Sequence, residues 1–68
     1  MLKRYAVAYI SFFDNILTQE LVTSRCEYDA LEALLESRGI EVYEDLKTVE
    51  ELKMLAFDCD CMISVIEV

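Results

Sequence analysis

Apolar positions in the first third of the chain follow the pattern of a β-hairpin. Residues 3–13 are rich in aromatic and β-branched side chains, and both alternating faces of this segment are apolar. The dipeptide Asp14-Asn15 supplies turn residues that tolerate positive φ, and residues 16–23 resume the strand pattern. We therefore expect two antiparallel strands joined by a two-residue loop, with Tyr9 paired to Glu20.

One face of this hairpin is assigned to the helices, because small alanines let a helix approach closely. The residues assigned to that face are Ala6, Ala8, Ile10, Phe12, Leu17 and Leu21. The opposite face is more amphipathic and contains Tyr5, Tyr9, Thr18 and Glu20. Because a tyrosine combines apolar area with a polar tip, Tyr5 and Tyr9 are the expected contacts of an oligomer formed through an exposed sheet face.

The middle of the chain carries the signals of two helices. Ser24 and Glu27 have the spacing of a capping box, which predicts a first helix over about residues 25–38. Gly39 then stands where a glycine that ends a helix belongs. A basic residue, Arg38, in the last turn suits the helix dipole.

A second capping box and a final apolar run complete the pattern. Thr48 and Glu51 predict a helix over about residues 49–57. Residues 40–47 are ambiguous: they allow a short extended segment, and we expect Leu46 within them to turn inward. The β-branched run at residues 61–68 predicts a third strand.

The predicted order is β-β-α-α-β, which favours a two-layer α+β sandwich with a three-stranded sheet and two helices packed on one face. We place the first strand in the centre. We expect the third strand to run parallel to it, because two antiparallel helices would return the chain to the end where the first strand began. Residues 1–68 have room for a single compact domain. Three strands leave free edges and an uncovered face, so we also expect a homodimer.

Negative charge is concentrated in the middle of the chain. Residues 26–60 contain eleven acidic and three basic side chains, which by themselves account for the net charge of −8. Since the flanks are predicted strands, this charge should lie on the helical layer. An acidic surface repels phosphate, so we expect no direct binding of nucleic acid or an anionic membrane, and a basic protein surface as partner.

The clearest acidic row lies on the first predicted helix, where three charges are about 5 Å apart along the axis. A DNA strand has one phosphate per ~3.4 Å, so mimicry of DNA would need acids from other segments. The predicted partner-binding residues are Asp29, Glu32, Glu36, Glu44, Asp45 and Glu50. Solubility alone is a competing explanation for a net charge of this size.

Residues that carry chemistry are few. The chain has no His and no glycine-rich phosphate loop, so we expect neither a catalytic site nor a cofactor. Asp58 and Asp60 are the one candidate carboxylate pair, and their spacing is more typical of a solvated turn. Cys26, Cys59 and Cys61 are too few for a usual zinc site, and we expect free thiols in a reducing cytoplasm. No apolar stretch approaches the ~20 residues of a membrane span.

The opening YAVAYISFFDN, followed by a second strand and by SRCEYDALEALL, resembles small accessory proteins encoded by tailed bacteriophages. The resemblance covers about residues 4–36. It implies an intracellular phage or prophage protein that binds and diverts a host protein. It assigns no role to any residue.

Three functional hypotheses follow. The first is a non-enzymatic protein-binding module that inhibits or modulates a host nucleic-acid-handling or defence protein through an acidic helical face. The second is a structural or assembly module that forms a homo-oligomer through its sheet face or an edge. The third and weakest is a small metal-binding protein that uses the three cysteines.

Overall fold

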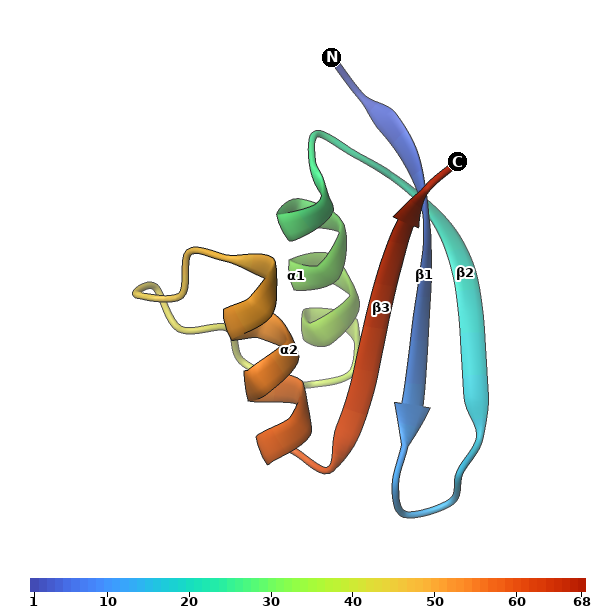
Figure 1. The fold of residues 1–68 in the computed structure, drawn as a ribbon, viewed down its shortest axis with the longest axis vertical. Coiled ribbons are helices and arrows are strands. Elements are labelled where there is room, and N and C mark those ends of the chain that lie inside the picture. Colours follow the sequence, from blue (N-terminus) through green and yellow to red (C-terminus); the bar gives the residue numbers. More distant parts are fainter.

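The chain folds into one three-stranded sheet covered on one side by two helices (Figure 1). The computed structural model describes all residues from Met1 to Val68. In chain order the elements are β1 (Lys3–Ser11), β2 (Leu17–Ser24), α1 (Glu27–Ser37), α2 (Val49–Asp58) and β3 (Cys61–Glu67). The sheet has the order β2-β1-β3. The predicted α+β sandwich with the first strand in the centre is therefore confirmed.

The direction of β3 differs from the prediction, because β3 pairs antiparallel to β1. The prediction assumed that the two helices run antiparallel to each other. In Figure 1 both helices instead run in the same general direction, away from the end of the sheet that holds the two termini, and the long connection between them carries the chain back to the start of α2. The chain thus leaves α2 at the end of the sheet where β1 finishes, and β3 returns alongside β1.

The β1–β2 hairpin is closed by a longer loop than expected. Tyr9 pairs with Thr18 rather than Glu20, which moves the register by two residues but keeps the same side chains on each face. A two-residue turn of the favoured type needs positive φ at both central positions, and only Asn15, at 57°, has it. The Asn15 N–H instead donates to the Ser11 carbonyl at 2.8 Å, which closes a wider turn.

Along the paired strands the two faces of the sheet are the reverse of the prediction. Phe12, just beyond β1, does meet a helix as predicted, because its ring lies edge-on to that of Phe57 in α2, with 5.7 Å between centroids. Tyr5 is 3% exposed and Val7 is 1% exposed beneath the helices, whereas the expected core residues Leu17 and Leu21 are exposed. The alanines that allow close packing come from the helices, since Ala30 and Ala56 are fully buried there. With small residues on the helices, the strands fill the interface with the larger side chains, and the strand alanines face outward.

The first helix begins two residues later than predicted. Ser24 is not its cap, because it still pairs with Lys3 in the β1–β2 ladder. The N-cap residue is Cys26, whose side chain makes no capping hydrogen bond. Ser24, which the capping-box pattern assigned to the start of the helix, is therefore the last residue of β2.

The other helix ends agree with the sequence. Gly39 has φ +79°, and its N–H donates to the Glu36 carbonyl at 3.1 Å while the Ile40 N–H donates to Leu35 at 3.0 Å. This pair of bonds is the Schellman arrangement that a left-handed glycine allows. At α2 the predicted capping box forms, with the Thr48 hydroxyl accepting from the Glu51 N–H at 3.2 Å and the Glu51 carboxylate accepting in return.

The core lies between the sheet and the two helices. Its largest fully buried side chains are Leu31, Leu35, Leu52, Val7 and Cys61. The connection between the helices forms no strand, but Ile40, Val42 and Leu46 pack against this core, as expected for Leu46. Neither helix reaches the length and apolar character needed to cross a membrane.

Candidate functional site

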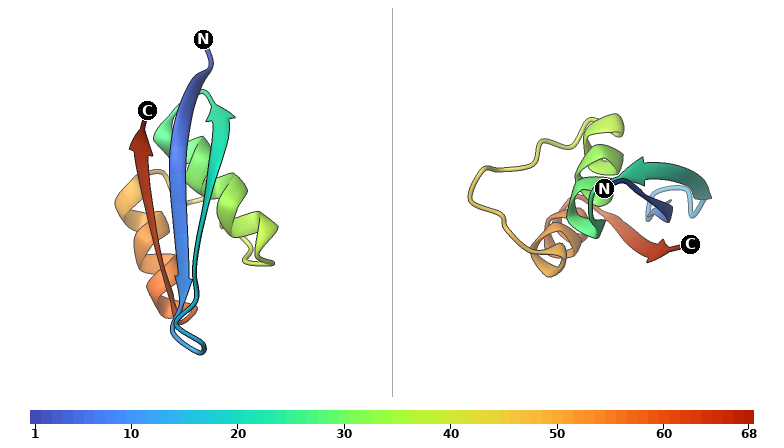
Figure 2. Two further views of the ribbon diagram at one scale, coloured as in Figure 1. Left: turned by 90° about the vertical axis from the view of Figure 1, so that its right-hand side faces the viewer. Right: turned by 90° about the horizontal axis from the view of Figure 1, so that it is seen from above.

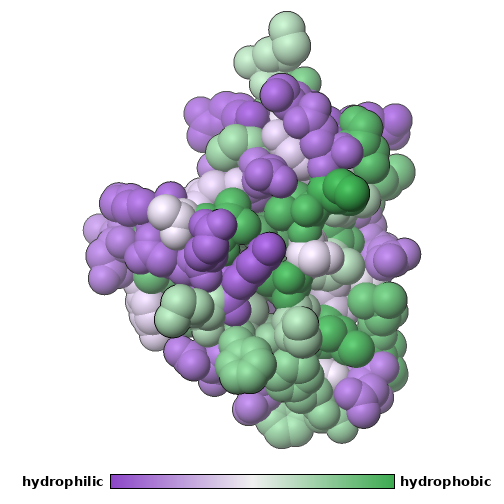
Figure 3. All heavy atoms as spheres, in the orientation of Figure 1, coloured by the Kyte–Doolittle hydropathy of each residue, from purple (hydrophilic) through white to green (hydrophobic).

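Hydrophilic residues gather on the helical side of the molecule, over the connection between the helices and the start of α2 (Figure 3). Few of the acids there have a cationic neighbour. The ion pairs are Arg25 with Asp29 at 3.0 Å and Lys3 with Glu67 at 3.7 Å. Of the eleven acids between residues 26 and 60, Asp29 alone is therefore in an ion pair. The helical layer presents carboxylates that the chain itself leaves without counter-charges.

Two of the predicted partner-binding acids, Glu32 and Glu44, border one hollow between α1 and the connection that follows it. The hollow has a volume of about 480 Å³. Its other lining residues are Tyr28, Val42, Tyr43, Leu46 and Lys47. The hollow thus combines aromatic and aliphatic walls with two carboxylates and one ammonium group.

The connection is held in place at several points along its length. The Tyr28 hydroxyl, on α1, donates to the Leu46 carbonyl at 2.7 Å. The Glu51 carboxylate accepts from the backbone N–H groups of Lys47 at 2.9 Å and Thr48 at 3.0 Å. Just before these anchors, the Leu46 N–H donates to the Tyr43 carbonyl at 3.2 Å and forms the turn that presents Glu44. The wall of the hollow is therefore a bonded turn attached to both helices.

The titration properties of two groups report the electrostatics around this site. Burial, followed by the nearby charges of Glu32, Glu51 and Asp29, raises the pKa of Tyr28. The hydrogen bond from the Lys47 backbone N–H lowers the pKa of Glu51 most, and hydrogen bonds from Thr48 lower it further. The acids around Tyr28 therefore create a negative potential where α1 meets the connection, and Glu51 is held there as a carboxylate.

The composition of the hollow matches the shape of a basic side chain. Lys and Arg have an apolar stem and a cationic head, so the stem suits Val42 and Leu46 while the head suits the carboxylates of Glu32 and Glu44. The ring of Tyr43 adds a surface on which a guanidinium can stack. Lys47 opposes this binding through its charge.

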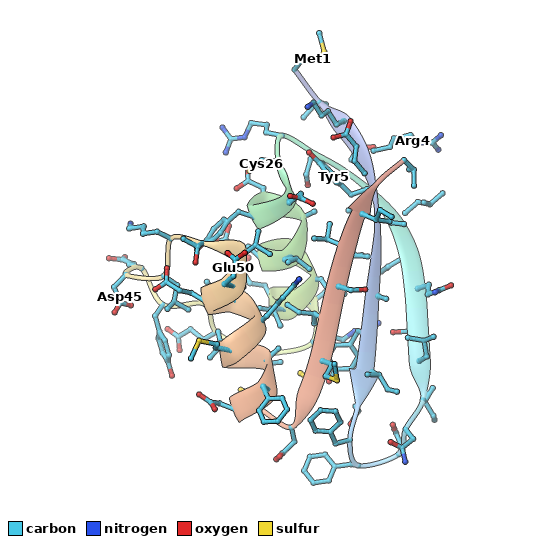
Figure 4. The ribbon with its side chains drawn as sticks, in the orientation of Figure 1. Met1, Arg4, Tyr5, Cys26, Asp45 and Glu50 are labelled. Atoms are coloured by element: carbon cyan, nitrogen blue, oxygen red, sulfur yellow. The ribbon has the colours of Figure 1, made fainter.

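The other four predicted acids are dispersed. Asp29 is held by Arg25, and Glu36 is exposed in the last turn of α1. Asp45 lies at the tip of the connection and Glu50 in the first turn of α2 (Figure 4). The structure therefore brings together two of the six predicted residues and leaves the others on surrounding parts of the same layer.

The two tyrosines predicted as oligomer contacts, Tyr5 and Tyr9, both face the helices. In Figure 4, Tyr5 points toward the helical side of the sheet and Arg4 points away from it. The Arg38 guanidinium covers the ring of Tyr9, with its carbon 4.8 Å from the ring centroid, and also donates to the Thr18 hydroxyl at 2.8 Å. Burial raises the pKa of both tyrosines. Tyr5 is therefore buried, and Tyr9 is half-buried beneath Arg38.

The outward face of the sheet is exposed instead of the tyrosine face, and the sequence did not predict this. Its residues are Arg4, Ala6, Ala8, Ile10, Leu17, Gln19, Leu21, Thr23, Met62, Ser64, Ile66 and Val68. We call this set the open sheet face. The signal was present in the sequence, because alternate positions of all three strands carry no acid in an acidic chain, whereas the inward positions include Glu20 and Glu67.

The three cysteines are not brought together. Cys26 precedes α1 and Cys59 follows α2, at opposite ends of the helical layer, so the predicted alternative of a shared metal site does not form. No group of three His, Cys, Asp or Glu side chains is placed to hold a metal ion. Cys61 is buried, its thiol donates to the Ala56 carbonyl at 3.2 Å, and burial raises its pKa. Asp58, the last residue of α2, and Asp60, in the turn that leads into β3, are both exposed.

Comparisons with protein-family models, curated proteins and solved structures found no match. The resemblance to phage-encoded proteins therefore stays a prediction.

Proposed function

We propose that this chain is a non-enzymatic protein-binding module that takes a basic segment of another protein on its helical side. The observation that carries the proposal is the hollow in which Glu32 and Glu44 stand over apolar walls. An Arg or Lys side chain of the partner enters this hollow, and the dispersed acids around it, such as Asp45 and Glu50, attract the rest of the basic surface.

The unpaired state of the acids supports this proposal. Carboxylates without intramolecular counter-charges lose no existing ion pair when a cationic partner arrives. Complementary charge also speeds encounter between two proteins and makes their association sensitive to salt. We place this binding in the cytoplasm, in keeping with three free thiols of which Cys26 and Cys59 are exposed. The partner class suggested by the chemistry is a protein with an Arg-rich or Lys-rich surface, such as one that handles nucleic acid.

The test uses a fluorescently labelled peptide of alternating Arg and Ala, titrated with the protein at low ionic strength and followed by fluorescence anisotropy. We expect binding that weakens steeply as salt is added. The double variant Glu32→Gln/Glu44→Gln should weaken binding about tenfold or more, because it removes both carboxylates of the hollow. Lys47→Gln should strengthen binding, because it removes the repelling charge.

The matched control is Glu41→Gln/Asp58→Asn, which removes two exposed acids that do not border the hollow. Both double variants have the same net charge, so any difference between them reports the hollow rather than the overall field. Equal weakening by the two double variants would contradict the assignment of the hollow. Absence of binding by the unaltered protein at low salt would contradict the proposal itself.

A further inference from the structure

The open sheet face stands out from the rest of the molecule by its lack of acids. The chain has fourteen Asp and Glu residues, yet none has its side chain on this face, and Arg4 is its one charged side chain. Four large apolar side chains project from the two outer strands: Leu17 is 56% exposed, Leu21 61%, Met62 54% and Ile66 64%. In the left view of Figure 2 the three strands lie in front of both helices, so no element of the chain covers this face.

The open sheet face is grooved along its centre. The central strand contributes the small residues Ala6 and Ala8, which form the floor between higher side chains on β2 and β3. The groove appears as a hollow of about 400 Å³ around Ala6 and Ala8 and a second of about 150 Å³ toward Ile10. The relief is therefore a ridge, a groove and a ridge, spaced one strand apart at about 4.8 Å.

We propose that this face packs against the same face of a second copy of the chain. The two copies are related by a two-fold axis that runs parallel to the strands and passes between β1 and one of its neighbours. The two sheets are then offset by one strand, so that a ridge of each copy lies over the groove of the other. Ala6 pairs with Leu21 on one side and Ile66 on the other. In either arrangement a large side chain of one copy thus lies over Ala6 of its partner, and the contact is reciprocal as a two-fold interface requires.

The distribution of charge indicates that the occupant of this face is a second copy of the chain rather than a basic protein. A basic partner is drawn to the acidic helical layer, whereas the open sheet face has no acidic side chain of its own. Glu20 also borders its larger hollow, but it alternates to the opposite face of β2. Two copies joined by this face keep their helical layers roughly 30 Å apart, given ~10 Å between packed sheets and ~10 Å for each helix. That separation is several times the Debye length of about 8 Å at physiological salt, so repulsion between the two acidic layers is largely screened.

The size of the face predicts a weak dimer. Because the sheets are offset by one strand, two strands of each copy overlap, which gives a flat footprint of roughly 25 by 10 Å. The relief of the side chains raises the accessible area, but the area buried per partner stays below the ~600 Å² at the lower end of specific interfaces. We therefore expect association in the micromolar range rather than a permanent dimer.

The experiment is light scattering coupled to size-exclusion chromatography from about 10 µM to about 1 mM, a range that brackets weak association. The average mass should rise from the 7.9 kDa of a monomer toward twice that value. Ala6→Glu, on the floor of the groove, should keep the mass at that of a monomer throughout. Met54→Glu, at an exposed apolar position on α2, adds the same charge to the helical side and should dimerise as the unaltered protein does.

Circular dichroism of each variant checks that it is folded. If Ala6→Glu lowers the folded fraction, Ser64→Glu replaces it, since Ser64 is an exposed polar residue that lines the same groove. A monomer at every concentration overturns the proposal and leaves the face to another occupant, such as a helix of a different protein. A dimer that survives both acidic variants also overturns it, because pairing of free strand edges does not need the groove. Neither result bears on peptide binding by the helical side.

Discussion

The two sides of the sheet are made of alternate residues of the same three strands, but they have opposite surroundings. The inward side places Tyr5 and Val7 beneath helices that supply Leu31 and Leu35. The outward side places two alanines between exposed leucine, methionine and isoleucine side chains. In this chain the side with large central residues is the core, and the side with small central residues is a groove open to a partner.

The difference shows that alanine in a strand does not by itself mark the face that a helix covers. Close packing needs small residues on one of the two surfaces, and here Ala30 and Ala56 on the helices provide them. The strand alanines are then free to shape the outer surface. A test of this comparison must therefore change similar residues on the two sides and compare the results.

The largest expected effect is the contrast between two leucine truncations. Leu35→Ala should lower the free energy of unfolding by about 2–5 kcal/mol, because Leu35 is fully buried between the layers. Leu21→Ala should change it by less than about 0.5 kcal/mol, because Leu21 is largely exposed on the open sheet face. Urea denaturation of both variants, at a concentration where the chain is monomeric, measures the difference. Similar losses at the two sites would contradict the assignment of the faces.

A smaller contrast separates the two predicted capping residues. Thr48→Ala should cost about 1 kcal/mol of stability, because its hydroxyl accepts the Glu51 N–H at the start of α2. Ser24→Ala should stay within about 0.5 kcal/mol, because Ser24 ends a strand and caps no helix. The same urea titration compares them, and a larger loss for the serine variant would show that α1 begins where the sequence pattern placed it.

The smallest expected effect concerns Glu51 and appears only in acid. Backbone hydrogen bonds lower its pKa below the usual 4.5 in the folded chain, so its ionised form favours folding. This contribution is fully present above that unfolded pKa of about 4.5 and is lost as the pH falls through the lowered folded value. The stability advantage of the unaltered protein over Glu51→Gln should therefore be constant at neutral pH and shrink below about pH 4.5.

The matched control for this measurement is Glu50→Gln, which removes the same charge from the same helical turn without touching the capping box. Thermal unfolding between pH 3 and pH 7 follows all three proteins. An advantage over Glu51→Gln that does not change with pH would show that the carboxylate contributes only as a neutral acceptor.

The sequence was sufficient for features that rest on local chemistry. Gly39 ends α1 and Thr48 begins α2 because turn and cap geometry depend on a few neighbouring residues. The direction of β3 and the choice of the covered face depend on how distant segments meet. The first segment of the hairpin is apolar on two sides and the second is mixed on both, so periodicity left the covered face undetermined, and an argument from alanine size chose the wrong one.

The candidate site was likewise predictable only in its local features and not in the contacts between distant segments. Composition located the acidic charge on the helical layer, but no spacing rule links Glu32 on α1 to Glu44 in the following connection. Their meeting depends on the hydrogen bond from Tyr28 to the Leu46 carbonyl, which joins residues eighteen positions apart. The open sheet face likewise emerges only once the inward residues of the strands are known.

The central claim is that the helical side and the open sheet face are separate binding surfaces. Two-dimensional amide NMR tests it most directly when one sample series is followed through dilution and another through addition of the Arg-Ala peptide. Dilution should shift signals of outward sheet residues such as Ala6, Ala8 and Ser64, and the peptide should shift those of Glu32, Tyr43 and Glu44. Shifts in one shared set of residues under both conditions would contradict the claim.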